Sequence, residues 1–240
     1  MVAIRFADVR ALPVIVSRLR GLFDLDADLD AIGAHLAQDP RLAPLVAARP
    51  GLRTPGAWDG FELAVRAILG QQVTLQAART LAGRLTSAFG SRLEPDAGDG
   101  GALTRAFPTP AQLAQADLGM MGLTTARAAA LKALATAACA DPRLFEQAAS
   151  LDEAIARFRA LPGIGEWTAQ YIALRALREA DAFPAADIGL MQGYAGDGQP
   201  RPTPKHLLEQ AEAWRPWRAY AAQHLWAAYA GRAPAKPKAA

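Results

Sequence analysis

The stretch Leu161-Pro-Gly-Ile-Gly-Glu-Trp-Thr-Ala-Gln-Tyr171 decides how this sequence is interpreted. Two glycines flank one apolar residue, and helix-forming residues follow at once. Glycine adopts positive φ at little cost, so Gly163 and Gly165 permit a tight hairpin whose backbone approaches a ligand closely. A helix that begins near Gly165 presents unpaired N–H groups, which favour a phosphate. The stretch predicts a hairpin that binds a nucleic-acid backbone; the plainer alternative is an ordinary connection between two helices.

A single carboxylate follows this stretch. The passage Phe183-Pro-Ala-Ala-Asp-Ile-Gly-Leu190 places Asp187 22 positions after Gly165. An acid near a bound nucleic acid is a candidate for chemistry on it. Asp is also a favoured N-cap, so a cap for a helix that begins at Ile188 is the alternative, and the two roles are compatible.

The composition indicates a globular protein. Of the 240 residues, 52% are apolar and 20% charged, which is enough to form a core. The net charge is +3, and 22 of the 26 basic residues are Arg. Arg suits bidentate phosphate contacts, but a GC-rich genome explains the same excess equally well.

Other functional classes find little support. Cys139 is the only cysteine, so a disulfide within the chain and an iron–sulfur cluster are excluded, and a small core residue is expected there. The three histidines lack the spacing of a zinc site. No apolar stretch approaches the ~18 residues of a membrane span, and no signal peptide is evident. We expect a soluble, monomeric protein of the bacterial cytoplasm, associated with the nucleoid when bound to DNA.

Apolar periodicity predicts an overwhelmingly helical chain. Residues 2–9 alternate weakly and predict at most one short strand. The chain divides into an N-terminal segment (1–52), a core (53–231, with the hairpin at 161–166) and a disordered basic tail (232–240). Helices are expected at 12–25, 58–72, 75–89, 124–140, 151–158, 166–177 and 214–229.

The hairpin motif with its downstream Asp resembles the helix–hairpin–helix, Gly/Pro-rich, Asp superfamily of DNA glycosylases. Within it, the likeness is to 3-methyladenine DNA glycosylase II (AlkA-like). The resemblance covers about residues 15–230 and implies an all-α fold in two helical lobes. Three more passages carry it: Phe61-Glu-Leu-Ala-Val-Arg-Ala-Ile-Leu-Gly-Gln-Gln72, Phe107-Pro-Thr-Pro110 and Trp214-Arg-Pro-Trp-Arg-Ala-Tyr-Ala-Ala-Gln-His-Leu-Trp226.

The resemblance makes Asp187 the catalytic residue. Breaking a bond between a base and deoxyribose builds positive charge on the sugar. An anion ~4 Å away at an effective dielectric of about 20 contributes on the order of 4 kcal/mol, or roughly three decades in rate. Lyase-competent members carry a lysine just after the hairpin, where this chain has Trp167. The resemblance therefore implies a monofunctional enzyme that uses water.

The resemblance also implies an aromatic base pocket formed by Trp167, Tyr171 and Trp226. Trp167 and Tyr171 are spaced i, i+4 and share one helix face. A desolvated aromatic face attracts a cationic alkylated purine by ~2 kcal/mol. The alternative is that these aromatic side chains simply fill a core.

DNA contacts are expected at Gly163, Ile164 and Gly165 in the hairpin, and at Gln71 and Gln72 near the end of an earlier helix. Base extrusion leaves a gap that a side chain must occupy, and Gln72 stands where relatives use an apolar wedge. A plain helix C-terminus is the alternative for Gln71 and Gln72.

No cofactor is expected apart from a monovalent cation at the hairpin. The resemblance suggests that it binds the backbone carbonyls of Arg159, Leu161 and Ile164.

This sequence departs from the family pattern in three places. Relatives carry a larger N-terminal β-containing domain, of which little beyond residues 2–9 is expected here. Ile188 and Gly189 replace larger side chains, which predicts a more open pocket. Glu166 places a negative charge beside the expected phosphate.

Together these features predict a monofunctional DNA glycosylase of base excision repair. It would remove alkylated purines of the 3-methyladenine type from damaged double-stranded DNA by base flipping and Asp-assisted attack of water. No membrane partner is expected. Two alternatives remain: a non-catalytic module that binds damaged DNA, and a glycosylase for another lesion.

Overall fold

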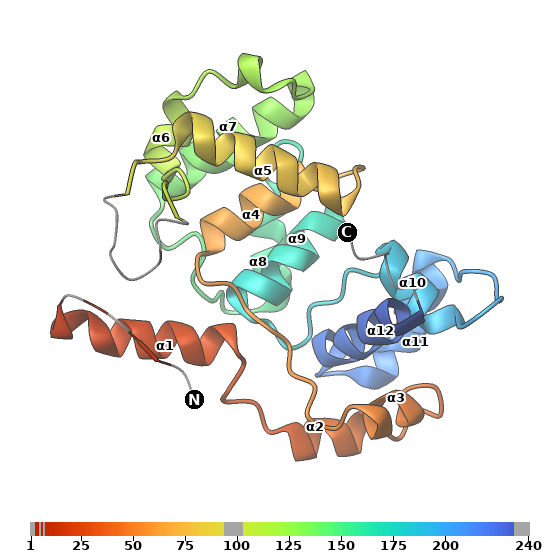
Figure 1. Cartoon of the computed structure of the whole chain (residues 1–240). Coiled ribbons are helices and arrows are strands. Elements are labelled where there is room, and N and C mark those ends of the chain that lie inside the picture. The colour runs from red at the N-terminus through yellow and green to blue at the C-terminus, as the bar shows by residue number, and fades with distance from the viewer. Residues whose placement is uncertain (1–2, 5, 7, 94–102, 233–240) are drawn as a thin grey trace, which may run out of the picture. The chain divides into compact units, whose positions relative to one another are not determined.

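The computed structural model describes residues 3–4, 6, 8–93 and 103–232, and its regular structure is helical (Figure 1). Among these residues the only β-pairing is an isolated antiparallel bridge between Arg92 and Arg105. The prediction of an all-α fold is confirmed. The helices are η1 (Val9–Ala11), α1 (Leu12–Leu22), α2 (Leu29–Leu36), α3 (Ala43–Ala48), α4 (Gly60–Leu69), α5 (Leu75–Phe89), α6 (Pro110–Gln115), η2 (Leu118–Met121), α7 (Thr125–Ala140), α8 (Leu151–Arg159), α9 (Glu166–Ile172), the π-helical turn η3 (Ala173–Leu177), α10 (Ile188–Ala195), α11 (Pro204–Ala211), η4 (Glu212–Trp214) and α12 (Arg218–Arg232).

The helix starts follow from local sequence. A short polar residue precedes most of the longer helices, and its side-chain oxygen accepts a hydrogen bond from an N–H of the first turn, which would otherwise lack a partner. Thr74 caps α5 in this way and Thr124 caps α7. At Thr109 the cap is reciprocal, because Gln112 bonds back to the Thr109 backbone.

The chain forms two compact units, which cross the boundaries expected from the sequence. The first unit joins residues 1–58 to 178–240, and the second contains residues 59–177. The expected boundaries, after residues 52 and 231, divide the chain into consecutive segments. The observed units instead arise from contacts between segments far apart in the chain. Local patterns do not reveal such contacts.

The second unit is built around α4. Its predicted apolar stripe is buried, with Phe61, Val65, Ile68 and Leu69 each at most 5% exposed. α4 packs against α7 and α9, and α6 packs on α7 (Figure 1). The hairpin connects α8 to α9 and therefore rests on this core.

The first unit is held by packing of α10 on α12 and by a buried acid. A Cβ added at Gly193 of α10 would lie 2.2 Å from the Leu225 carbonyl, so the two helices meet only because glycine stands there. The Asp24 side chain is buried, and it accepts hydrogen bonds from the Thr54 amide and the Tyr220 hydroxyl, both at 3.1 Å. This carboxylate joins the two chain segments of the unit.

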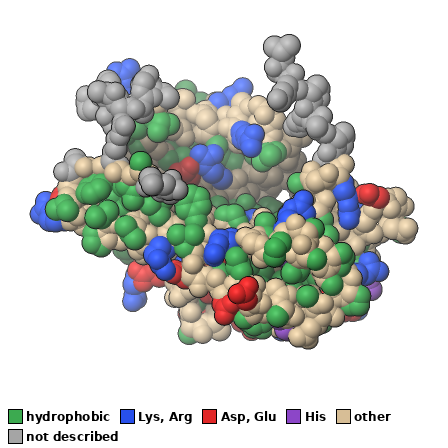
Figure 2. Space-filling model, turned by 60° about the horizontal axis from the view of Figure 1, so that its bottom comes forward, with side chains coloured by type: hydrophobic (Ala, Val, Ile, Leu, Met, Phe, Trp, Pro, Cys, Tyr) green, Lys and Arg blue, Asp and Glu red, His purple; other side chains and the backbone are tan. Residues whose placement is uncertain are grey.

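The N-terminal segment differs from its expectation. The described residues between 2 and 9 form no strand, and residues 1–2, 5 and 7 lie outside the described part. The helix expected at 12–25 ends at Leu22, and none of its residues is buried. Val14 and Val16 of this helix are exposed, and Figure 2 shows hydrophobic side chains among those on the surface in view. The predicted disordered tail lies outside the described residues, except that Arg232 ends α12.

Two further expectations meet the structure here. Cys139 was predicted to be a small core residue, but it is exposed on α7, so that prediction is wrong. It lies near the C-terminal end of α7, where its side chain is exposed. Within the described ranges no helix is long and apolar enough to cross a membrane.

Candidate functional site

The hairpin turns at Gly163. This residue has φ +77°, and a Cβ added to it would lie 2.6 Å from the Cβ of Ala130 in α7. Positive φ and a close approach to α7 therefore both require glycine. Gly165 differs from the expectation of a left-handed turn: its φ is −87°, and nothing lies within 4 Å of an added Cβ. It stands at the N-cap of α9, where no side chain caps the helix.

The hairpin is anchored by Ile164 and by Gln71. The Ile164 side chain is buried, so only its backbone is available to a ligand. The Gln71 amide donates to the Gly163 carbonyl and to the Thr168 hydroxyl, both at 3.0 Å. Gln71, predicted to contact DNA, is turned toward the hairpin and braces it.

Gln72 has the opposite orientation. Its side chain is exposed, and its backbone is left-handed with φ +55°, an uncommon conformation for a residue other than glycine. The preceding peptide is fixed, because the Arg127 guanidinium donates to the Gln71 carbonyl. The loop thus presents Gln72 to solvent on a braced backbone.

Trp167 and Tyr171 line a cleft of about 450 Å³ in the second unit. Their rings are stacked on each other, with centroids 5.3 Å apart and planes 9° apart. A base therefore does not fit between these two rings, so this pair cannot sandwich a base in the observed arrangement. The remaining lining residues come from α4, the loop after it and α5: Leu63, Arg66, Ala67, Gly70, Val73, Leu75, Ala78 and Arg79.

A cation already lies over Tyr171. The Arg175 guanidinium is 6.0 Å from the ring centroid, placed there by the π-helical turn that follows α9. Burial lowers the pKa of Arg175, and Tyr171 opposes this shift. Trp167 stacks on Tyr171 from the preceding turn of the same helix.

Asp187 lies in the first unit at the start of α10. Its Oδ1 accepts the Leu190 amide at 3.0 Å, so the predicted capping role is observed. The same oxygen accepts the indole N–H of Trp226 at 2.8 Å. Two donors on one oxygen fix the orientation of this half-buried carboxylate.

Gly189 does not open the pocket as its small size predicted. A Cβ added there would lie 3.1 Å from Cδ1 and 3.4 Å from Nε1 of Trp226. The indole occupies the space that a larger residue would fill, so that expectation is wrong for Gly189. Ile188 is 57% exposed.

The predicted residues thus form two pairs. Trp167 and Tyr171 belong to the second unit with the hairpin and Gln72, whereas Asp187 and Trp226 belong to the first.

Comparison with known proteins identifies the family. Residues 65–219 match the HhH-GPD superfamily base excision DNA repair proteins, and residues 1–59 match the AlkA N-terminal domain. The DNA-3-methyladenine glycosylase 2 of Escherichia coli is 37% identical over 216 residues, which cover 88% of this chain and 70% of that protein. The chain belongs to the HhH-GPD superfamily.

A second relative is longer. The "Probable bifunctional transcriptional activator/DNA repair enzyme AlkA" of Mycobacterium tuberculosis is 42% identical over 219 residues, which cover 91% of this chain and 43% of that protein. The chain therefore spans less than half the length of this relative.

A solved structure also matches. The 3-methyladenine DNA glycosylase of Schizosaccharomyces pombe in complex with abasic DNA has a TM-score of 0.65 and 25% identity, covering 82% of this chain and 95% of that one. The expected helix–hairpin–helix glycosylase fold is thus shown. The AlkA match over residues 1–59 also corrects the expectation that little beyond residues 2–9 corresponds to the N-terminal domain.

The expected cation site of the HhH-GPD hairpin uses residues at the end of α8 and in the turn. The Leu161 carbonyl accepts the Ile164 amide at 3.2 Å and has a second lone pair. Glu166 pairs with Arg159 at 3.2 Å, which offsets the charge expected to disfavour phosphate. A monovalent cation on the backbone carbonyls of Arg159, Leu161 and Ile164 stays a prediction. In the described ranges no group of three or more His, Cys, Asp or Glu residues could hold a metal.

Sequence reasoning missed the residues that position this HhH-GPD site. Arg127 and Thr168 hold Gln71, and Arg175 covers Tyr171. These partners come from other elements or from a π-helical turn, and no spacing rule points to them. The small size of Gly189 could be noted from the sequence, but the position of the Trp226 indole against it could not.

Proposed function

We propose that the chain is a monofunctional DNA glycosylase that hydrolyses the N-glycosidic bond of alkylated purines of the 3-methyladenine type. Its partner is double-stranded DNA that contains the damaged base, bound by a monomer. Water attacks C1′ of the flipped nucleotide, the base leaves with the bonding electrons, and a proton of the water passes to Asp187 or to solvent. The products are the free base and an abasic site.

The observation that carries this proposal is the carboxylate of Asp187 held on Oδ1 by Leu190 and Trp226. A fixed anion stabilises the positive charge that develops on the deoxyribose without reorganising during the reaction. An N-cap alone needs only the Leu190 amide. The additional bond from Trp226 is unnecessary for capping and orients the acid.

The positions of the lysines among the described residues favour hydrolysis over lyase chemistry. Trp167 follows the hairpin where a lysine nucleophile would stand, and an indole forms no Schiff base. Lys132 donates to the Ala114 carbonyl at 3.3 Å, and Lys205 is exposed in α11. The relatives named as 3-methyladenine glycosylases support the same assignment.

Base recognition in this proposal uses aromatic side chains, Trp167 among them. An alkylated purine carries positive charge, and Trp is the strongest side-chain partner for a cation over a ring. Arg66 and Arg79 border the cleft and would repel such a base, but Arg66 is paired with Glu62 at 2.7 Å. The positively charged base is already a good leaving group, so one carboxylate suffices.

Asp187→Asn tests the mechanism, because Asn keeps the cap and loses the charge. We expect base release from methylated duplex DNA to fall by about three decades, with DNA affinity and melting temperature retained. Asp187→Ala is the matched control: it should be as inactive and also lose about 1 kcal/mol of stability with the cap. A fully active Asp187→Asn variant would exclude this mechanism.

The same assay separates the rival functions. A non-catalytic damage-binding module would bind damaged duplex with salt-dependent affinity and give no alkali-sensitive abasic product. A panel of duplexes carrying alkylated, deaminated or oxidised bases would show whether another lesion is preferred.

A further inference from the structure

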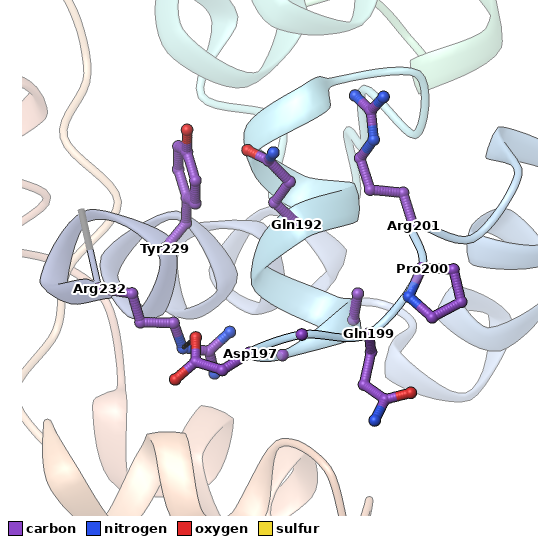
Figure 3. Close-up of a pocket in the computed structure, with 10 residues that line it drawn as sticks. Gln192, Asp197, Gln199, Pro200, Arg201, Tyr229 and Arg232 are labelled. Atoms are coloured by element: carbon purple, nitrogen blue, oxygen red, sulfur yellow. Dashed lines mark ion pairs between the residues drawn. The ribbon is translucent and has the colours of Figure 1, made fainter.

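The first unit contains a second cavity of about 550 Å³, at the C-terminal ends of α10 and α12. Its size is in the range of small-ligand sites. Figure 3 shows its residues as sticks: Gln192 from α10, Tyr229 and Arg232 from α12, and Asp197 to Arg201 from the connection to α11. None of these residues has been given a role above.

The connection that forms one wall has a defined backbone. Gly196 and Gly198 have φ of +85° and +69°, which glycine adopts without strain. These turns return the chain toward α12 and place Arg201 at the cavity. The wall is therefore built from backbone conformations that other residues adopt poorly.

The cavity is bordered by cations. Arg201 and Arg232 lie on two sides of it, and Figure 3 shows them well separated. The acid at the rim is Asp197, whose side chain is 83% exposed and lies 3.4 Å from Arg232. Such an exposed pair is weak and readily exchanged. The chemistry fits a ligand with two anionic groups, one for each arginine.

The cavity also follows the Asp187–Trp226 pair along the same helix faces. Tyr229 stands three positions after Trp226 in α12, and Gln192 stands four after the exposed Ile188 in α10. Positions spaced by three and four share a helix face. In Figure 3 Tyr229, Gln192 and Arg201 point toward the same side from three different elements. A strand that reaches Asp187 can continue over this surface.

We propose that this cavity binds the nucleotide next to the damaged one in the same DNA strand. A nucleotide within a strand carries a phosphate on each side of its sugar, which matches one arginine on each side of the cavity. The exposed ring of Tyr229 offers a face for the sugar or the base. The proposal rests on the proposed function, because it requires a damaged strand at Asp187.

Salt dependence of DNA binding provides the first test. Each phosphate contact contributes about 0.9 to the slope of log K against log[salt]. Arg201→Ala and Arg232→Ala should each reduce the slope by about that amount. Asp197→Asn should instead raise affinity, because it releases Arg232 and removes a negative charge. Arg10→Ala, at an exposed arginine paired only with Asp8 in the described chain, should change neither quantity.

Neutral phosphate analogues locate the contact. A duplex with a stable abasic analogue fixes the register without base release, and methylphosphonates are placed one at a time along that strand. For the unmodified protein, neutralising a phosphate beside the lesion should weaken binding. In Arg201→Ala, neutralising one of these phosphates should no longer weaken binding. In Arg232→Ala, the same should hold for the adjacent phosphate.

The outcomes separate the two proposals. Equal penalties in the unmodified protein and both variants, or unchanged salt slopes, would overturn the cavity assignment even if base release is normal. Absence of base release by the unmodified protein would overturn the enzymatic function, whereas the binding scan would still report whether the cavity contacts phosphate. Melting temperatures of the variants verify that all are folded.

Discussion

The indole N–H of Trp226 donates a hydrogen bond of 2.8 Å to Oδ1 of Asp187, the oxygen that also accepts the Leu190 amide at 3.0 Å. The indole reaches this oxygen because Gly189 has no side chain in its path. Trp226 was expected in the wall of a base pocket, and the structure adds a second task. It orients the carboxylate, so a change at Trp226 is a test of positioning.

Trp226→Phe keeps an aromatic ring and removes the donor. A hydrogen bond to a charged group contributes about 1.5–3 kcal/mol, so the single-turnover rate of base release should fall roughly ten- to hundredfold. KM should change less than kcat if the ring also contacts the base. Gly189→Ala should give a similar loss by displacing the indole. A Trp226→Phe rate within twofold of the original would contradict the positioning role.

The two hairpin glycines should respond differently to alanine. Gly163→Ala combines a left-handed backbone with a contact of 2.6 Å to Ala130, so we expect about 2–5 kcal/mol of lost stability. Gly165→Ala is compatible with its φ of −87° and meets no atom within 4 Å, so its melting temperature should change far less than that of Gly163→Ala, a small N-cap cost opposing a small gain from a stiffer unfolded chain. Thermal melting of both variants checks this difference.

DNA binding by Gly165→Ala tests whether a phosphate contacts the N-terminus of α9. If a phosphate lies against the first amides of α9, the added methyl group obstructs it, and affinity should fall about tenfold with stability intact, the loss of roughly one good hydrogen bond. Undiminished affinity in this well-folded variant would show that the phosphate does not approach Gly165.

His224 should give the protein a pH-dependent stability. Burial lowers the pKa of this imidazole below the ordinary 6.5, and Arg49 acts in the same direction, whereas a hydrogen bond with the Leu45 backbone opposes it. The unfolded chain then binds the proton first, so stability is fully present above about pH 6.5 and is lost as pH falls below it. His224→Gln should show a smaller drop in melting temperature between pH 7.5 and 5.5. Identical drops in the two proteins would exclude this contribution.

The sequence predicted most of what is local. The cap at Asp187 was predicted from its residue type, and the apolar stripe of α4 from its spacing. The hairpin followed from Gly163, where positive φ and crowding against α7 leave no other residue. These features depend on a few neighbouring residues, so sequence carries them.

What failed depends on residues that are distant in the chain. The bond from Trp226 to Asp187 spans 39 positions, and the joining of residues 1–58 to 178–240 is longer still. The i, i+4 spacing predicted that Trp167 and Tyr171 lie on the same helix face. It did not predict that their rings stack directly on each other, which leaves no space for a base between them. The exposure of Cys139 likewise depends on which side of α7 is covered.

Gln72 combines a backbone cost with a proposed task in base extrusion. Its φ of +55° is unfavourable for glutamine by about 1–2 kcal/mol, and glycine would remove that cost while making the unfolded chain more flexible. Gln72→Gly should therefore keep or raise the melting temperature. Gln71→Ala should lower it, because the bonds to Gly163 and Thr168 are lost.

Activity of Gln72→Gly should change in the opposite sense to its stability. A duplex needs a side chain in the gap left by the flipped base, whereas a single strand does not. The rate of base release from duplex DNA should fall relative to the rate from the same lesion in a single strand, measured under single-turnover conditions. Gln72→Leu, which restores an apolar wedge, should recover the duplex rate. An unchanged ratio between duplex and single strand in Gln72→Gly would show that this side chain does not fill the gap.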